Sequence, residues 1–306
     1  MATRYVLLPT DDGRELIGTV PAEVEVGVWN GTGDLPEAAR ATGFWVPPFL
    51  SGSQLSSAVT QMSDLQVVQL LSAGADAYVG RIPEHVMLCD ARGVHTSSTS
   101  EWVLAVLLAA LRDIPRFVRA QEAHKWDQSR TDELAGKRAL IVGAGAIGDG
   151  IRSRLLPFDV DVTMVARTPR DGVHSVDELP TLLPDADIVV VIVPLTDATR
   201  GLADAKFFAA MQDGALFING ARGPVADTEA LAAEVLSGRL RAALDVTDPE
   251  PLPAEHPLWD AEGLLLTPHV GGAVPGFPRR AFGLVGEQIR RWAAGEPLIN
   301  AVVDGY

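Results

Sequence analysis

Three short segments in the second half of the chain each place one chemically active side chain after an apolar run. These side chains are a cation, a carboxylate and an imidazole: Arg222, Glu250 and His269. Groups of these types can together bind an anion and transfer a proton near neutral pH. Taken alone, each also has an ordinary interpretation. His269 can be a satisfied histidine at a strand end, Arg222 can be half of a surface ion pair, and Glu250 can be solvated in a proline-rich loop.

The elements that would bring these side chains together are strands of a parallel sheet. Short aliphatic runs, typical of strands buried on both faces, alternate with helix-like segments from residue 139 onward. The strands are predicted over 139–142, 160–166, 188–193, 215–219, 241–246 and 264–267, and the helices over 146–156, 176–183, 204–211 and 227–237. Right-handed crossovers place the carboxyl ends of such strands along one edge, where ligands bind.

A glycine-rich turn follows the first of these strands and has the spacing Gly-x-Gly-x-x-Gly at Gly143, Gly145 and Gly148. The first glycine permits a tight turn, the second lets a pyrophosphate approach the backbone, and the third lets the helix pack close to the strand. The N-terminus of the next helix offers free N–H groups to phosphates. The pattern predicts a dinucleotide site, and its bland alternative is a strand–helix turn that binds nothing.

The first part of the chain predicts a smaller sheet domain. Strands are expected over 5–8, 24–29, 44–46, 65–70 and 85–89, with helices over 35–41 and 54–62. Ser98 and Glu101 have the spacing of a capping box at the start of a long apolar helix, which Pro115 should kink or end. A last helix, 277–294, has no strand after it and is expected to pack back on the first domain. The predicted domains are 1–96 with 275–306, and 97–274.

The composition excludes several classes of function. The 306 residues carry a net charge of −15 and are 47% hydrophobic, which argues against nucleic-acid or anionic-membrane surfaces. The single cysteine, Cys89, excludes an intramolecular disulfide and fits a reducing compartment. No His, Asp and Glu cluster has metal-ligand spacing, so no metal site is predicted. The N-terminal residues lack the apolar segment of a signal peptide, and the chain is expected to be cytoplasmic.

The segment after the second strand of the larger domain indicates which dinucleotide binds. An acidic side chain there would bind the ribose diol of NAD, but the sequence has Ala166 followed by Arg167, Thr168 and Arg170. The two arginines can clamp a 2′-phosphate, and the threonine can donate a hydrogen bond to it. The sequence therefore favours NADP over NAD. A solvated basic turn, with an acid supplied by a distant loop, is the alternative.

These motifs, in this order, resemble the D-isomer-specific 2-hydroxyacid dehydrogenases over nearly the whole sequence. The resemblance includes 67–76, 100–104, the glycine turn, 193–199 and the segments with Arg222, Glu250 and His269. It implies a Rossmann-type nucleotide domain, a smaller flavodoxin-like substrate domain, and a homodimer formed mainly through the nucleotide domain.

The resemblance also implies roles for individual residues. His269 matches the family's general acid/base, and Glu250 matches the carboxylate that favours the imidazolium and orients the ring. Arg222 matches the arginine that holds the substrate carboxylate and polarises the keto oxygen. Asp245 matches a residue on the nicotinamide side. Other positions assigned to the cofactor are Ala146, Ile147, Pro194, Thr199, Gly220 and Ala221.

The smaller domain is expected to contribute to substrate binding. Backbone N–H groups of Gly74 and Ala75 match a loop that holds the substrate carboxylate. The segment 44–48, in combination with Arg167 and Thr168 of the cofactor loop, looks most like the glyoxylate/hydroxypyruvate reductase branch. Trp45 therefore either lines the mouth of the pocket or is plain core. Thr247 departs from the commoner pattern, in which an aromatic residue follows Asp-Val, and leaves the shape of the pocket wall open.

The leading hypothesis is an NADPH-dependent reductase that converts a small anionic 2-oxo acid to the D-2-hydroxy acid. A formate or phosphite dehydrogenase is an alternative within the enzymes. Formate enzymes of this fold pair the histidine with glutamine, so Glu250 argues against formate, whereas phosphite is harder to exclude. A dinucleotide-sensing protein without catalysis is the alternative from another class.

Overall fold

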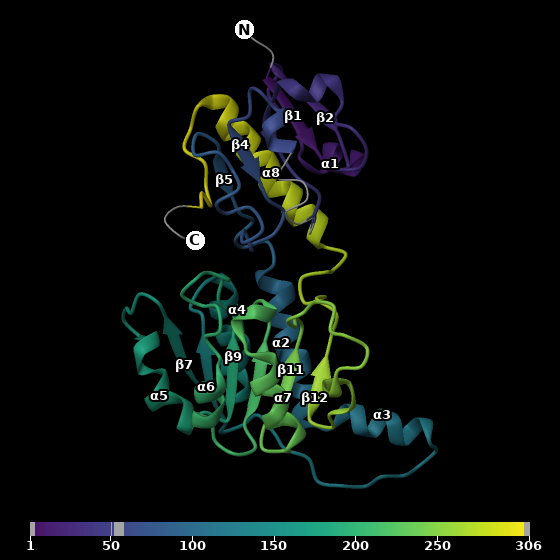
Figure 1. The fold of residues 1–306 in the computed structure, drawn as a ribbon, viewed down its shortest axis with the longest axis vertical. Coiled ribbons are helices and arrows are strands. Elements are labelled where there is room, and N and C mark those ends of the chain that lie inside the picture. The colour runs from purple at the N-terminus through teal and green to yellow at the C-terminus, as the bar shows by residue number, and fades with distance from the viewer. Residues whose placement is uncertain (1–3, 50, 52–57, 303–306) are drawn as a thin grey trace. The chain divides into compact units, whose positions relative to one another are not determined.

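The computed structural model describes residues 4–49, 51 and 58–302. The chain divides into two compact units: a first unit, Met1–His95 with Val274–Tyr306, and a second unit, Thr96–Ala273 (Figure 1). These boundaries differ by one residue from those expected from the sequence. Within the described ranges, no helix has the length and apolar character required to cross a membrane.

The second unit is built on a seven-stranded sheet in which every pairing is parallel, in the order β12-β11-β10-β9-β6-β7-β8. Its strands are β6 (Arg138–Val142), β7 (Asp161–Ala166), β8 (Val173–Ser175), β9 (Ile188–Val191), β10 (Leu216–Asn219), β11 (Arg241–Leu244) and β12 (Leu264–Leu266). The strand order reverses between β6 and β9, which in such sheets is where ligands bind. The edge strand β8 was not predicted, because its three residues form no apolar run.

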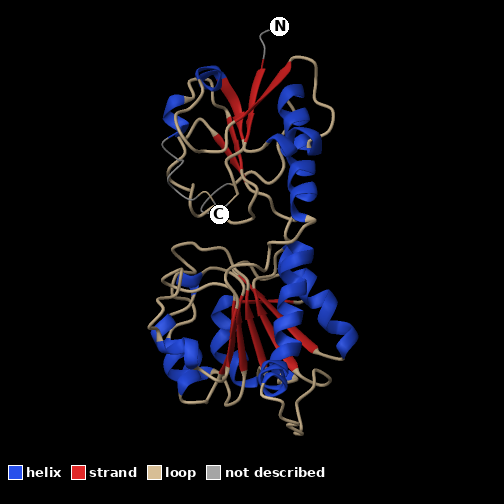
Figure 2. Ribbon diagram, turned by 90° about the vertical axis from the view of Figure 1, so that its right-hand side faces the viewer, coloured by secondary structure: helices blue, strands red, loops and turns tan. Residues whose placement is uncertain are grey.

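Helices cover both faces of this sheet (Figure 2). The α-helices of this unit are α2 (Thr96–Leu111), α3 (Ile114–Glu122), α4 (Ala146–Leu155), α5 (Leu179–Leu182), α6 (Ala205–Ala210) and α7 (Thr228–Leu236), and all but α3 pack on the sheet. Alternate residues of β6 face opposite ways: Ile141 lies in a core with α2 and α4, whereas Leu140 lies in a core with α5, α6 and α7. This alternation is the period of two expected of a strand buried on both faces.

The long helix predicted after the first domain begins earlier than a capping box at Ser98 would place it. Helix α2 begins at Thr96, so Ser98 lies inside its first turn and the predicted capping box is wrong. The helical path breaks at Asp113, whose φ is +50°, and Pro115 lies in the first turn of α3. The prediction that Pro115 ends or kinks the helix is confirmed, because proline is tolerated only at the start of a helix.

The first unit has a five-stranded parallel sheet in the order β2-β1-β3-β4-β5. Its strands are β1 (Arg4–Leu8), β2 (Val24–Val28), β3 (Thr42–Trp45), β4 (Val67–Gln69) and β5 (Met87–Cys89). The last helix, α8 (Phe277–Ala294), packs into the core of this unit through Ala281, Val285 and Ile289. The predicted fold class, α/β with two parallel sheets, is confirmed.

The short helices of the first unit differ from the two that the sequence predicts. Residues Glu37–Ala41 form a 3-10 helix after Pro36 in place of an α-helix. Residues 54–57 of the helix predicted over 54–62 lie outside the described residues, and 58–61 form a 3-10 turn. Helix α1 (Asp11–Leu16), capped by the Thr10 side chain, was missed because it is one and a half turns long and contains Gly13.

Candidate functional site

The imidazole of His269 and the carboxylate of Glu250 are in direct contact. Nδ1 of His269 lies 2.7 Å from Oε1 of Glu250. An ionised carboxylate can only accept a hydrogen bond, so Nδ1 donates and the proton that remains to be exchanged belongs to Nε2. In the described part of the chain Nε2 has no hydrogen-bond partner, and 28% of the side chain is exposed, so a ligand can reach it. The pair is thus arranged to move a proton at Nε2.

The turn that carries His269 is held by one residue of the neighbouring strand end, Asp245. The backbone N–H of His269 donates to the Asp245 carbonyl oxygen (2.8 Å). The next two N–H groups donate to its carboxylate, Val270 to Oδ1 (2.9 Å) and Gly271 to Oδ2 (2.8 Å). Asp245 is 5% exposed. The sequence predicts a cofactor contact for Asp245, and the structure shows in addition that its carboxylate organises the histidine turn.

The segment that carries Glu250 is fixed against the turn that follows β10. Thr247 donates from Oγ1 to the carbonyl of Pro249 (2.8 Å), and Thr228 donates to the carbonyl of Asp248 (2.8 Å). A Cβ atom on Gly223 would lie 1.9 Å from the carbonyl oxygen of Thr247, so the two backbones touch. Thr247 therefore anchors the proline-rich segment, a role that a threonine hydroxyl can fill and an aromatic ring cannot.

Arg222 follows β10, the strand beside β11. The buried side chain of Asn219 spans the turn: it accepts from the N–H of Ala221 (3.0 Å) and donates to the carbonyl of Arg222 (3.1 Å). The Arg222 guanidinium donates to the carbonyl of Ala221 (2.9 Å) and is partly exposed. Since β10, β11 and β12 are neighbours, the sheet brings Arg222, Glu250 and His269 to the same edge, as predicted.

The glycine turn after β6 has the shape of a phosphate cradle. Gly143 has φ +124°, and a Cβ there would lie 2.5 Å from the carbonyl oxygen of Ile192. A Cβ on Gly148 would lie 1.9 Å from the carbonyl oxygen of Gly143. A Cβ on Gly145 would meet nothing within 4 Å, so packing does not require glycine there. Open space at Gly145, just before Ala146 and Ile147 begin α4, fits the close approach of a pyrophosphate.

The basic segment after β7 lies beside this turn. Arg170 Nη2 donates to the carbonyl of Ala144 (2.7 Å), so its guanidinium supports the glycine turn from outside. Arg167 and Thr168 are exposed, and neither side chain has a hydrogen bond or ion pair with any residue the structure describes. Two of the three predicted phosphate ligands are therefore available, and the third holds the loop.

The remaining positions assigned to the cofactor lie after β9 and β10. Thr199 donates from Oγ1 to the carbonyl of Pro194 (2.6 Å) and accepts from the N–H of Thr196 (2.8 Å), which closes the loop after β9. Gly220 lies against the ring of Trp102, with 3.2 Å from an added Cβ to the indole. Trp102 lies within the segment 100–104 of the family resemblance, but no role was predicted for it.

The predicted substrate residues of the first unit lie on two of its strand ends. Trp45 is fully buried and its ring lies 6.4 Å from that of Trp29, which favours the core interpretation over the pocket mouth. Gly74 and Ala75 lie in the loop after β4, where Ser72 donates from Oγ to the carbonyl of Gly74 (2.7 Å). Their contact with the substrate stays a prediction.

A family model and a solved structure both match this chain. The family model "D-isomer specific 2-hydroxyacid dehydrogenase, NAD binding domain" matches residues 104–271. A crystal structure of a D-isomer specific 2-hydroxyacid dehydrogenase from Xanthobacter autotrophicus, in complex with NADPH and MES, is 32% identical. Its TM-score is 0.85, and the match covers 99% of this chain and 98% of the other.

Two curated relatives extend the comparison. The glyoxylate reductase/hydroxypyruvate reductase of Homo sapiens is 31% identical over 258 residues, which are 77% of this chain and 76% of the relative. The D-3-phosphoglycerate dehydrogenase of Archaeoglobus fulgidus is 33% identical over 226 residues, which are 71% of this chain and 43% of the relative. The matched region thus spans less than half of the second relative.

Proposed function

The chain belongs to the D-isomer-specific 2-hydroxyacid dehydrogenases, a family of NAD(P)-dependent oxidoreductases, and from this premise we propose that it reduces a small 2-oxo acid to the D-2-hydroxy acid with NADPH. The observation that carries the proposal is the 2.7 Å contact of His269 with Glu250, on the sheet edge that also holds Arg222 and the glycine turn. A cytoplasmic location stays a prediction from composition.

His269, Arg222 and Glu250 have different tasks in this reaction. A nicotinamide held at this edge would supply the hydride for the keto carbon. His269 delivers the Nε2 proton to the keto oxygen as that oxygen becomes an alkoxide, so C=O, hydride and proton give CH–OH. Arg222 holds the carboxylate of the acid and stabilises the charge that grows on the oxygen. Glu250 accepts a hydrogen bond from Nδ1 of His269 and so orients the ring with Nε2 toward the substrate.

The test is a panel of acids with the purified full-length chain. NADPH should be oxidised by at least one of glyoxylate, hydroxypyruvate, pyruvate and phenylpyruvate, followed as loss of nicotinamide absorbance. Reduction of NADP⁺ by formate or phosphite, with every 2-oxo acid inert, would replace the proposal with the dehydrogenase alternative. Tight NADPH binding without turnover of any compound would replace it with the dinucleotide-sensing alternative.

Replacing Arg167 with alanine should weaken NADPH binding while leaving NADH binding nearly unchanged. A charge-assisted contact to a phosphate is worth about 1.5–3 kcal/mol, which is roughly a 10- to 150-fold increase in Kd for NADPH. The exposed guanidinium has no partner in the described ranges, so its removal breaks no internal hydrogen bond. Titration of both cofactors, followed by quenching of tryptophan fluorescence, measures the two Kd values.

Two further variants control this experiment. Arg40→Ala removes an exposed arginine of the first unit and should change neither Kd. Arg170→Ala removes the hydrogen bond to the Ala144 carbonyl of the glycine turn, so it should weaken both cofactors. Equal loss of NADPH and NADH affinity in Arg167→Ala would remove this residue from the 2′-phosphate site.

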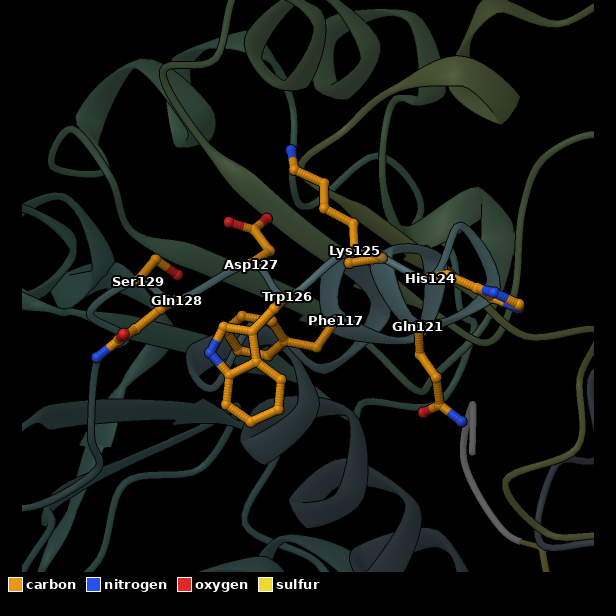
Figure 3. A pocket seen from close by; sticks show the side chains of 9 residues that line it. Phe117, Gln121, His124, Lys125, Trp126, Asp127, Gln128 and Ser129 are labelled. Atoms are coloured by element: carbon orange, nitrogen blue, oxygen red, sulfur yellow. The ribbon is translucent and has the colours of Figure 1, made fainter.

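We place the homodimer contact of the second unit at α3 and the segment after it. Within the described residues α3 has no buried side chain. Ile114 and Val118 are 48% and 49% exposed, and Trp126 is 94% exposed. Of these residues Trp126 lines a hollow of about 630 Å³, together with Phe117, Gln121, His124 and Lys125 (Figure 3). Apolar surface of this kind marks association sites, and a second copy of the chain would cover it.

The substitution Val118→Glu should shift the dimer toward monomer, because a carboxylate buried in an apolar contact loses its hydration. Light scattering coupled to size exclusion, over a range of concentrations, measures the mass. Met87→Glu, at a 46% exposed methionine of the first unit, is the matched control and should leave the mass unchanged. A wild-type chain that is monomeric at all concentrations would refute the dimer.

A further inference from the structure

Trp102 belongs to a hydrogen-bonded chain that ends on the turn of His269. Its indole Nε1 donates to Thr267 Oγ1 (3.0 Å), and that hydroxyl donates to Asp245 Oδ1 (2.6 Å). The same carboxylate accepts the N–H groups of Val270 and Gly271. We propose that Trp102 and Thr267 are positioning residues, which set the place of the His269 imidazole through Asp245. This inference rests on the proposed role of His269.

The hydrogen bonds that link Trp102, Thr267 and Asp245 each have a fixed direction. An indole N–H can only donate, and a carboxylate can only accept. The single proton of the Thr267 hydroxyl must therefore go to Asp245, and its lone pair must receive the proton of Trp102. Because no member can reverse, a valine at position 267 leaves the indole N–H without its acceptor and takes one of three donors from the Asp245 carboxylate.

The backbone turn that carries His269 is strained, and its hydrogen bonds to Asp245 stabilise it. His269 has φ +55°, a left-handed conformation that costs a non-glycine residue about 1–2 kcal/mol. Three consecutive N–H groups, from 269 to 271, converge on Asp245 and offset that cost. The position of the His269 ring therefore depends on the hydrogen bonds that hold the backbone of this turn to Asp245.

Trp102 also contacts the neighbouring strand end. A Cβ on Gly271 would lie 3.3 Å from its indole, and a Cβ on Gly220 would lie 3.2 Å from it. The indole therefore lies between the turn after β12 and the turn after β10, which leads to Arg222. One side chain of α2 consequently touches the supports of both the proposed proton donor and the proposed anion ligand.

A displaced proton donor should affect the chemical step more than binding. A shift of about 1 Å in a catalytic group can cost roughly 100-fold in rate. We expect Trp102→Phe, which keeps a ring but loses the N–H, and Thr267→Val, which keeps the shape but loses the hydroxyl, to lower kcat about 10- to 100-fold. The KM for NADPH should stay near the wild-type value in both.

The variants differ in ways that a purely structural role would not reproduce. Thr267→Ser keeps the hydroxyl and should restore most of kcat. The double variant Trp102→Phe/Thr267→Val should lose no more than Thr267→Val alone, because both changes cut the same chain. Trp29→Phe removes an indole hydrogen bond in the first unit (3.1 Å, to the carbonyl of Thr32) and should leave kcat unchanged.

Amide hydrogen exchange gives a readout that does not depend on turnover. In Thr267→Val the N–H groups of Val270 and Gly271 should exchange faster than in the wild type, while those of β6 keep their protection. If the wild type reduces no 2-oxo acid, the proposed function fails, and exchange still decides whether the chain positions the turn. Unchanged exchange at 270 and 271, or losses of kcat that only follow a fall in Tm, would overturn the inference.

Discussion

Replacing His269 with asparagine should lower kcat for 2-oxo acid reduction by about 10²- to 10⁴-fold, which is the usual contribution of a positioned general acid. The Kd for NADPH should stay near the wild-type value, because the glycine turn and the basic segment after β7 lie on other strands. Asparagine is the suitable replacement, since it tolerates the left-handed conformation at φ +55° and cannot transfer the proton. Initial rates and cofactor titrations on the same preparation measure both quantities.

A second histidine–glutamate pair in the chain provides the control. Nδ1 of His174, on the edge strand β8, lies 2.8 Å from Oε2 of Glu178 in the 3-10 helix after it, and this hydrogen bond lowers the pKa of the Glu178 carboxyl. His174→Asn removes the same type of contact and should leave kcat unchanged. Full activity in His269→Asn, or equal losses in the two variants, would show that His269 is not the proton donor.

The comparison of these two pairs shows what the sequence can predict about the site. Both histidines contact a glutamate, yet only His269 comes after the carboxyl end of a strand, where ligands bind in such sheets, whereas His174 lies within the short edge strand β8. Its place at the carboxyl edge beside Glu250 follows from strand order, and strand order follows from the alternation of apolar runs and helices. The Arg222, Glu250 and His269 edge was predictable for this reason.

The hydrogen bonds that hold the His269 turn in place could not be predicted from strand order. Trp102 and Thr267 are separated by 165 positions, and their hydrogen bond depends on how α2 packs against the sheet. Asp245 was assigned to the cofactor through the family resemblance. Its hydrogen bonds to the N–H groups of Val270 and Gly271 depend on the geometry of the turn, which cannot be predicted from a residue pattern. Backbone partners of a side chain are set by tertiary structure.

Burial accounts for the weaker predictions about single side chains. Trp45 fits either a pocket or a core by residue type, and only its complete burial beside Trp29 separates the two. No pattern in the sequence marks His95 as buried, yet it is 7% exposed and its ring stacks on Phe277 at a centroid distance of 4.9 Å. Such residues precede or follow turns, where the periodicity that reports burial in helices and strands is lost.

Replacing Arg222 with glutamine should lower kcat/KM for a 2-oxo acid by about 10²- to 10⁴-fold. Two charge-assisted hydrogen bonds to the substrate are lost, each worth about 1.5–3 kcal/mol, and the keto oxygen loses a positive neighbour as charge develops on it. KM should rise and kcat should fall, because the guanidinium acts on both the bound acid and the transition state. Steady-state rates over a range of 2-oxo acid, at saturating NADPH, separate the two effects.

The structure allows this variant to be interpreted without a change in the fold. Asn219 bonds to the carbonyl of Arg222, so that the hydrogen bond survives any side chain at 222, and the extended φ of −143° suits every residue. Arg222→Lys supplies the control for charge: it keeps a cation but loses the planar fork, so it should recover part of KM and little of kcat. If lysine restored both parameters, Arg222 would act as a simple counter-charge. If glutamine left kcat/KM intact, the carboxylate of the acid would have to be held elsewhere, and the edge formed by β10, β11 and β12 would contribute only the proton.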